Sequence, residues 1–151
     1  MLLRLVEPST TSSRAETNVQ LICVAPIGVP IVWPMVAKYI AAAILRGGNL
    51  SSFAALAQSL FDGSATLWVA WDGVTFIAAA VTQVGDINGV RIGTVMAVGG
   101  RGIERFGPML AQLEEHFREN GCVRSRICGR RGWLRYYADY RQTAVVMEKK
   151  L

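Results

Sequence analysis

Arginine and aromatic side chains are interleaved near the end of the chain, in a pattern suited to contact with phosphates and flat rings. Arg124 and Arg126 are two residues apart in an expected strand, so their side chains share a face. The cluster continues with Arg130, Arg131 and Arg135, among the rings of Trp133, Tyr136, Tyr137 and Tyr140. Such a mixture contacts phosphates and stacks on bases, and it is also enriched in protein interfaces. A solvated basic face above packed rings has the same pattern, so three interpretations remain open.

The positive charge of the chain is concentrated in its second part. The net charge is +5, and residues 91–151 carry twelve basic and six acidic side chains, against four and five in residues 1–90. This asymmetry favours a polyanionic partner, which is a nucleotide cofactor, a nucleic acid or an acidic protein surface. We therefore expect protein partners in an assembly, with nucleic acid as a second possibility.

Cysteine and histidine do not form a metal-binding pattern. The three cysteines, Cys23, Cys122 and Cys128, contain no CxxC pair, and their odd number fits reduced thiols better than a disulfide framework. The single histidine, His116, has no second ligand at a suitable spacing. We expect no metal site.

The composition indicates a packed domain without a membrane span. Apolar residues make up 52% of the chain and charged residues 18%, which argues against disorder. The longest apolar stretch, residues 31–45, contains Pro34 and Lys38 and is shorter than the roughly 20 residues needed to cross a bilayer. No signal peptide is apparent, so we expect a protein kept in a cytoplasm or in an assembly made there.

The pattern of elements predicts one α/β domain over residues 18–151, preceded by a flexible or partner-bound arm over residues 1–17. The first part of the domain is expected to contain a strand over 18–24, a helix over 35–46 opened by Pro34, and a helix that begins at Ser51 or Ser52. Three antiparallel strands follow over 65–71, 74–84 and 90–98, joined by turns at Asp72–Gly73 and Asn88–Gly89. The last part is expected to contain a helix ending near Asn120, a strand over 122–128, a short helix within 129–138 and a final strand over 142–149.

This order of elements resembles the GNAT fold of acetyl-CoA-dependent N-acetyltransferases. The C-terminal run GRRGWLRYYADYRQTAVVMEKKL supports the resemblance, and it is also similar to GNAT-like proteins encoded by bacteriophages and prophages. The resemblance implies an α+β domain whose mixed central sheet has an antiparallel meander and is flanked by helices.

The resemblance also implies a place for acetyl-CoA, between two strands that splay apart, with its pyrophosphate at the N-terminus of the following helix. In this chain the expected contacts come from one glycine-rich stretch: Gly99, Gly100, Arg101, Gly102 and Arg105. A tight turn alone would give the same glycines. Where the family loop has small residues, this chain has Glu104, which repels phosphate, and the bulky Phe106. The sequence thus favours a degenerate site without a cofactor.

Catalytic groups of the family also have incomplete counterparts. The family uses a base, often a carboxylate on the meander strands, and a tyrosine on the last short helix as an acid. Residues 90–98 contain no carboxylate, and Asp86 lies in a turn. Arg135 stands at the usual tyrosine position, which leaves Tyr136 and Tyr137 as substitutes unless they only pack.

Three functions follow, in order of preference. The first is a non-catalytic structural or binding component with a GNAT fold, such as a head–tail or tail-associated protein of a bacteriophage virion, located in the host cytoplasm or the virion. The second is an active acyl-CoA-dependent N-acyltransferase, with acetyl-CoA held by Arg101 and Arg105 and Tyr136 or Tyr137 as the acid. The third is a nucleic-acid-binding module that uses residues Arg124 to Arg135, whose binding would weaken steeply with salt.

Overall fold

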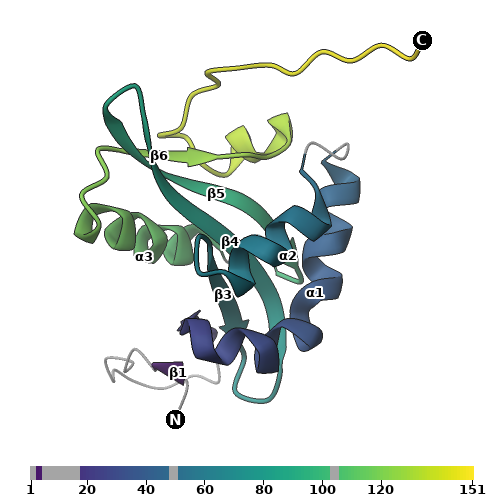
Figure 1. Cartoon of the computed structure of the whole chain (residues 1–151), viewed down its shortest axis with the longest axis vertical. Helices are drawn as coiled ribbons and strands as arrows, with labels where there is room; N and C mark the ends of the chain where they lie inside the picture. The colour runs from purple at the N-terminus through teal and green to yellow at the C-terminus, as the bar shows by residue number, and fades with distance from the viewer. Residues whose placement is uncertain (1–2, 5–17, 48–50, 103–105) are drawn as a thin grey trace.

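The structure, a computed structural model, describes residues 3–4, 18–47, 51–102 and 106–151, and shows one mixed sheet with helices on both faces (Figure 1). The strands lie in the order of their numbers: β1 (Leu3–Arg4), β2 (Gln20–Val24), β3 (Thr66–Trp71), β4 (Phe76–Ile87), β5 (Val90–Gly100) and β6 (Arg124–Ile127). The described residues also form the helices α1 (Val29–Arg46), α2 (Phe53–Phe61) and α3 (Phe106–Glu119) and the short 3-10 helices η1 (Pro26–Gly28) and η3 (Arg131–Arg135). The predicted fold class, an α+β domain with an antiparallel meander, is confirmed.

The meander forms as the two turn dipeptides predict. Asp72 Oδ1 accepts hydrogen bonds from the backbone N–H groups of Val74 and Thr75, both at 2.8 Å, and so closes the turn between β3 and β4. Asn88 and Gly89 have φ angles of 51° and 77°, the left-handed pair that a tight hairpin between β4 and β5 requires. Strands β2 to β5 are therefore antiparallel neighbours, whereas β6 returns through α3 and pairs parallel to β5.

The sheet separates two apolar cores because alternate side chains of a strand point to opposite faces. On β3, Leu67 and Val69 pack with α1 and α2, while Trp68 and Ala70 pack with α3. The predicted Ser52 cap of α2 is confirmed, since its hydroxyl accepts from the Ala55 N–H at 3.3 Å.

Helix α1 begins earlier than the sequence predicts. Pro34 was expected at the first helical position, but the helix starts at Val29 and Pro34 lies inside it. Proline has no N–H for the carbonyl four residues earlier, so a bend is expected there, and Figure 1 shows α1 changing direction along its length.

By length and composition alone, Pro26–Arg46 also matches a membrane-spanning helix, but its buried side chains form much of the core between α1, α2 and the sheet.

The end of the chain differs most from the prediction. The expected final strand over residues 142–149 does not form, and residues 141–151 are extended without regular structure. At the other end, Leu3 and Arg4 of the predicted arm pair with Val24 and Cys23 of β2, and residues 5–17 lie outside the described residues.

Two glycines let helices approach β5 from opposite faces. A Cβ added at Gly93 would overlap the ring of Phe117 on α3, whose side chain is fully buried. A Cβ added at Gly99 would overlap the backbone carbonyl of Tyr39 on α1 and lie 3.2 Å from the Ala43 Cβ. Strand β5 is thus in close contact with a helix on each face.

We predict that Gly93→Ala destabilises the protein by about 1–3 kcal/mol, the usual range for overpacking a filled core. Gly85→Ala is the matched control, since Gly85 lies on β4 with no atom near its added Cβ, and its effect should stay within about 0.5 kcal/mol. Urea unfolding of the two variants measures the difference. Equal effects would show that the Phe117 ring moves aside at little cost.

Candidate functional site

Strands β5 and β6 run together for only four residues and then part. Their parallel pairing joins Ile92–Val95 to Arg124–Ile127, and it ends with a hydrogen bond of 2.9 Å from the Cys128 N–H to the Val95 carbonyl. Beyond this point β5 continues to Gly100 beside β4, while the residues after β6 lead into η3. Along this second half of β5, the described residues supply no further strand partner on the β6 side.

A β-bulge lies at the point of divergence. Val81 of β4 pairs with Ala97, but the next residue, Thr82, pairs with Val95, so Met96 is the extra residue on β5. The bulge shifts the alternation of the strand: Val95 packs in the core beneath α3, and Ala97 packs in the core beneath α1. Opposite the bulge, the buried Thr82 hydroxyl accepts a hydrogen bond of 3.0 Å from the Trp68 indole N–H. Bulges of this kind bend a strand and end its pairing, and they are common beside active sites.

Two cavities flank the divergence, one on each face of the sheet. The larger, of about 70 Å³, opens towards the end of α1, and its walls are Ala43, Ile44, Arg46, Gly47, Ser51, Met96, Ala97, Val98, Cys128, Gly129, Arg130 and Trp133. The smaller, of about 20 Å³, lies beneath α3 among side chains that include Met109, Leu113, Ile127 and Tyr137. Val98 and Trp133 line both, so these two side chains separate the cavities.

The larger cavity combines apolar walls with positive charge. Met96, Ala97, Val98 and Trp133 offer apolar surface for a small acyl or alkyl group. Among the residues that the structure describes, Arg46 and Arg130 are the only charged ones that line it. Its volume suits the end of a ligand with a few non-hydrogen atoms, and the remainder of a larger ligand would lie outside.

Several solved structures are similar in fold to this chain. An aminoglycoside acetyltransferase from an uncultured soil metagenomic sample matches with a TM-score of 0.66 at 10% identity, over 91% of this chain and 99% of the other. A predicted acetyltransferase from Clostridium acetobutylicum, solved with acetyl-CoA, matches with a TM-score of 0.64 at 14% identity, over 87% of this chain and 96% of the other. A GCN5-related N-acetyltransferase from Ralstonia eutropha matches with a TM-score of 0.64 at 16% identity, over 89% and 99%.

The chain has the GNAT fold. No protein-family profile matches it, and no curated protein matches its sequence. The structural matches correct the order of functions inferred from the sequence. We preferred a non-catalytic component of a bacteriophage virion with a degenerate site, but the structures that share this GNAT fold are acetyltransferases, and one was solved with acetyl-CoA. These matches favour the alternative, an acyltransferase.

The glycine-rich stretch has two parts with different surroundings. Gly99 and Gly100 belong to β5, and an added Cβ at Gly100 would overlap the Ile77 carbonyl and Ala78 on β4. Arg101 is exposed and donates its N–H to the Ile77 carbonyl at 2.9 Å, and Gly102 follows with a φ of 75°. The remaining predicted loop residues, Glu104 and Arg105, lie outside the described residues, as does the side chain of Phe106.

The two predicted tyrosines lie in different environments. Tyr136 is 58% exposed, with the Arg135 guanidinium 5.9 Å from the centre of its ring. Tyr137 is only 8% exposed and lines the smaller cavity, and burial raises the pKa of its phenol. The structure thus brings Tyr137, but not Tyr136, to the divergence of β5 and β6.

The predicted basic patch is exposed, while three of its aromatic partners, Trp133, Tyr137 and Tyr140, are packed. Arg124, Arg126, Arg130, Arg131 and Arg135 all face solvent, and Arg130 also lines the larger cavity. The rings pack on one another beneath them, with centroid distances of 5.8 Å for Trp133 and Tyr137 and 6.1 Å for Tyr137 and Tyr140.

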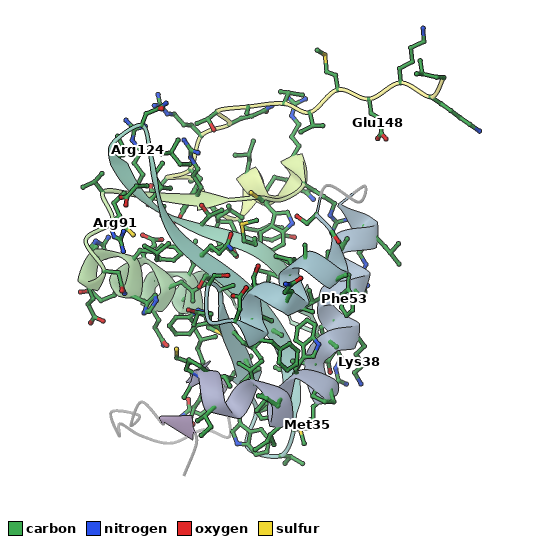
Figure 2. The ribbon with its side chains drawn as sticks, in the orientation of Figure 1. Met35, Lys38, Phe53, Arg91, Arg124 and Glu148 are labelled. Carbon is green, nitrogen blue, oxygen red and sulfur yellow. The ribbon has the colours of Figure 1, made fainter. Side chains whose placement is uncertain are left out.

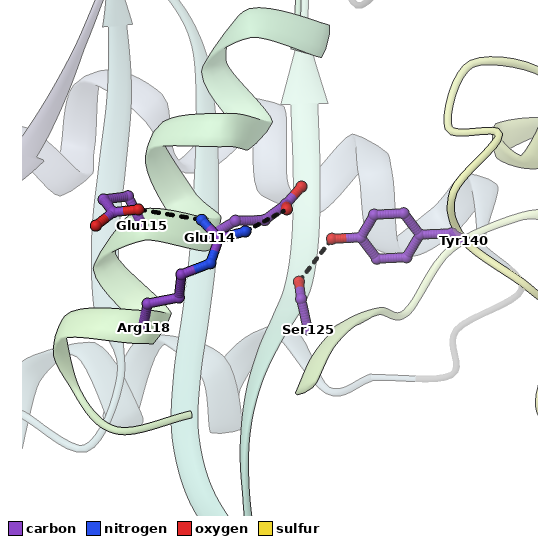
Figure 3. A network of polar contacts seen from close by, with 5 residues as sticks. All are labelled: Glu114, Glu115, Arg118, Ser125 and Tyr140. Carbon is purple, nitrogen blue, oxygen red and sulfur yellow. Dashed lines mark hydrogen bonds and ion pairs between the residues drawn. The ribbon is translucent and has the colours of Figure 1, made fainter. Parts of the chain in front are cut away.

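A hydroxyl pair holds this aromatic group on β6. Ser125 Oγ and Tyr140 Oη lie 2.6 Å apart in a hydrogen bond, beside the ion pairs that Arg118 of α3 makes with Glu114 and Glu115 (Figure 3). Burial raises the pKa of Tyr140, and the bond from Ser125 opposes this effect. Because Tyr140 packs on Tyr137, the bond helps to position the ring that lines the smaller cavity.

Several lining residues were missed in the sequence. In the sequence, Arg46 is simply the end of a helix, and Met96 and Val98 belong to an ordinary apolar strand. They line the cavity only because of the register of β5 against β4 and because β6 separates from β5 there. Among the described residues no cluster could hold a metal ion, and His116 packs edge-on against Trp68 at 5.0 Å.

We predict one fast-reacting thiol in the folded protein. Cys128 is exposed at the mouth of the cavity, Cys122 is buried, and burial raises the pKa of the Cys23 thiol, which lowers its reactive thiolate fraction. Titration with a disulfide reagent under native conditions should show one fast phase, which Cys128→Ser removes and Cys122→Ser keeps. A fast phase that survives in Cys128→Ser would contradict the placement of Cys128.

Proposed function

We propose that this protein is an acyl-CoA-dependent N-acyltransferase, whose acyl group enters between β5 and β6. The observation that carries the proposal is the cavity at the bulge, where the β6 side of β5 has no strand partner among the described residues and apolar side chains surround space for a small group. The matching acetyltransferase structures support the proposal because they share this GNAT fold. Acyl-CoA would supply a thioester carbonyl activated for attack by an amine.

The residues around the divergence fit parts of such a cofactor. The backbone of Met96 to Val98 offers hydrogen-bonding groups along the side of β5 that β6 has left, and Val98 and Trp133 offer apolar contact. Arg101 and Gly102 begin the connection to α3, whose N-terminus favours anions. We assign contact with the pyrophosphate to this connection and contact with the acyl group to the larger cavity.

Tyr137 is our candidate acid. Its pKa is raised by burial, so the phenol keeps its proton well above neutral pH and can donate it to a leaving sulfur. In the overall transfer a nitrogen–carbon bond forms, the carbon–sulfur bond breaks, and the amine loses one proton while the thiol gains one. No carboxylate lines either cavity among the described residues, so we assign removal of the amine proton to water.

The positive charge at the larger cavity affects which acceptor amines can bind there. Helix α3 packs on one face of the sheet, and the larger cavity opens on the other face beside the end of α1. An acceptor amine that enters from this second face meets Arg46 and Arg130. The described part of the lining has these two arginines and no carboxylate. Such a lining disfavours a polycationic amine and favours an amine that also carries a carboxylate or phosphate.

We predict that the wild-type protein releases thiol from acetyl-CoA in the presence of a suitable amine, and that Val98→Phe lowers kcat/KM at least tenfold. The larger side chain would fill the space between Val98 and Trp133. Val123→Phe is the matched control, because Val123 is exposed and lines neither cavity. Thiol release across an amine panel, with thermal unfolding to confirm folding, measures both. A folded Val98→Phe variant with full activity would contradict this site.

We predict that Arg46→Glu combined with Arg130→Glu shifts acceptor preference towards cationic amines by at least tenfold, which corresponds to about 1.4 kcal/mol. The measurement compares kcat/KM for β-alanine and for 1,3-diaminopropane, two amines of similar length and opposite second charge. Lys38→Glu combined with Lys150→Glu, at two exposed residues that line neither cavity, makes the same change of four charge units and controls for it. An unchanged ratio of the two constants would place the acceptor elsewhere.

A further inference from the structure

Two arginines of β6 lie together on one face of the sheet. Alternate residues of a strand point to opposite faces, and Ser125 and Ile127 lie on the α3 side, where Ser125 bonds to Tyr140 and Ile127 lines the smaller cavity. Arg124 and Arg126 therefore lie on the other side, and both are exposed. This is the side on which α1 and α2 pack and on which the larger cavity opens. We call these two residues the arginine row.

The arginine row leads to the larger cavity. Cys128 lines that cavity, and it follows Arg126 by two residues and Arg124 by four. At about 3.3 Å per extended residue, the two arginines lie about 7 and 13 Å from Cys128 along the chain. Arg130 then lies at the cavity wall itself. A ligand that extends from the cavity along β6 thus meets positive charge at regular intervals.

The sheet does not neutralise the arginine row on its own face. The register places neutral residues across from both arginines: Ile92 and Gly85 beside Arg124, and Thr94 and Gln83 beside Arg126. Helices α1 and α2, on the same side, contain no acidic residue in their described lengths, whereas α3 on the other side contains three.

The ion pairs of the described residues lie towards α3. Arg91 pairs with Asp86 at 3.3 Å and donates to the Asn120 carbonyl at the end of α3 at 2.7 Å, and Arg118 belongs to α3 itself. Figure 2 shows Arg91 beside the end of α3, with Arg124 apart from it. None of the ion pairs formed within the described chain includes the arginine row. Its charge is therefore available to an anionic partner.

The carboxylates of an extended peptide match this row. Side chains on the same side of an extended peptide repeat every two residues, about 7 Å, which is the spacing of the arginine row. Each guanidinium can hold a carboxylate through two parallel hydrogen bonds. Nucleic acid matches less well, because Trp133, Tyr137 and Tyr140 pack on one another on the α3 side instead of offering their faces to bases.

We propose that the arginine row binds the acidic segment of a peptide whose free amine enters the larger cavity. The binding of the acidic segment follows from the row, and the role of that amine as the acceptor rests on the proposed acyltransferase activity. The distances along β6 place the carboxylates two and four residues from the residue that carries the amine. Arg124 and Arg126 thereby determine specificity for acidic peptides, beyond the small anionic amines that Arg46 and Arg130 favour.

The test is the binding of a dye-labelled peptide to the full chain, measured by fluorescence anisotropy at low ionic strength. The peptide has a free N-terminal amine and glutamates as its third and fifth residues, and a reference peptide has glutamines there. We expect the glutamate peptide to bind at least about fivefold more tightly, as two exposed ion pairs allow. Combined Arg124→Gln and Arg126→Gln should remove this preference. The matched control, Lys149→Gln with Lys150→Gln, removes two exposed cations from the C-terminal end and should keep it.

Charge reversal gives a result that a misfolded variant cannot imitate. Combined Arg124→Glu and Arg126→Glu should bind a peptide with lysines as its third and fifth residues more tightly than the glutamate peptide. Equal binding of the glutamate and glutamine peptides by the wild type would overturn the proposal. A preference that survives the two glutamine substitutions, or tighter binding of an oligothymidylate of the same net charge, would overturn it as well.

Thiol release from acetyl-CoA with the same peptides separates this proposal from the proposed function. We expect a kcat/KM at least about fivefold higher for the glutamate peptide than for the glutamine peptide. Equal values in a protein that acylates other amines would show that the arginine row does not serve the acceptor. Selective binding of the glutamate peptide without thiol release from any amine would instead contradict the acyltransferase activity and leave the row as a binding surface for acidic peptides.

Discussion

Strand β5 is held between two helices at positions where only glycine fits. The ring of Phe117 lies over Gly93 from the α3 side, and the Tyr39 carbonyl lies over Gly99 from the α1 side. With both faces in close contact with helices and one edge paired with β4, the strand can change its neighbours only along the edge that faces β6. The divergence of β5 and β6, and the cavities beside it, therefore depend on these two close contacts.

The bulge at Met96 lies on this constrained strand and forms part of the cavity wall. It shifts the alternation of β5 where the Cys128–Val95 hydrogen bond ends the pairing with β6, so that Val95 packs beneath α3 and Ala97 beneath α1. Trp133 then lies between the two faces and lines both cavities. Backbone and apolar groups rather than a set of acidic residues form the site, which fits the binding and positioning of an acyl group more than carboxylate chemistry.

The sequence predicts well what depends on local pattern. The meander, its two turns and the Ser52 cap each follow from a few neighbouring residues, and they are confirmed. Pro34 was misplaced because a proline signals a helix start and a bend within a helix in the same way. The glycines from Gly99 onward suggested phosphate contact or a tight turn, yet Gly99 also fits against α1, which no pattern within the loop reveals. The bulge and the cavity depend on register between distant strands. The preference for a non-catalytic role rested on the altered loop and on the incomplete catalytic groups, and neither of these patterns shows how the strands diverge.

The most direct test of the account is a titration of acetyl-CoA followed by backbone amide resonances in a nitrogen–proton spectrum. We predict that the largest changes occur at Met96, Ala97 and Val98 and at the indole N–H of Trp133, while Gly85 on the far part of β4 stays unchanged. Changes confined to the exposed arginines of β6, or no changes at saturating acetyl-CoA, would contradict the claim that the space between β5 and β6 is an acyl-CoA site.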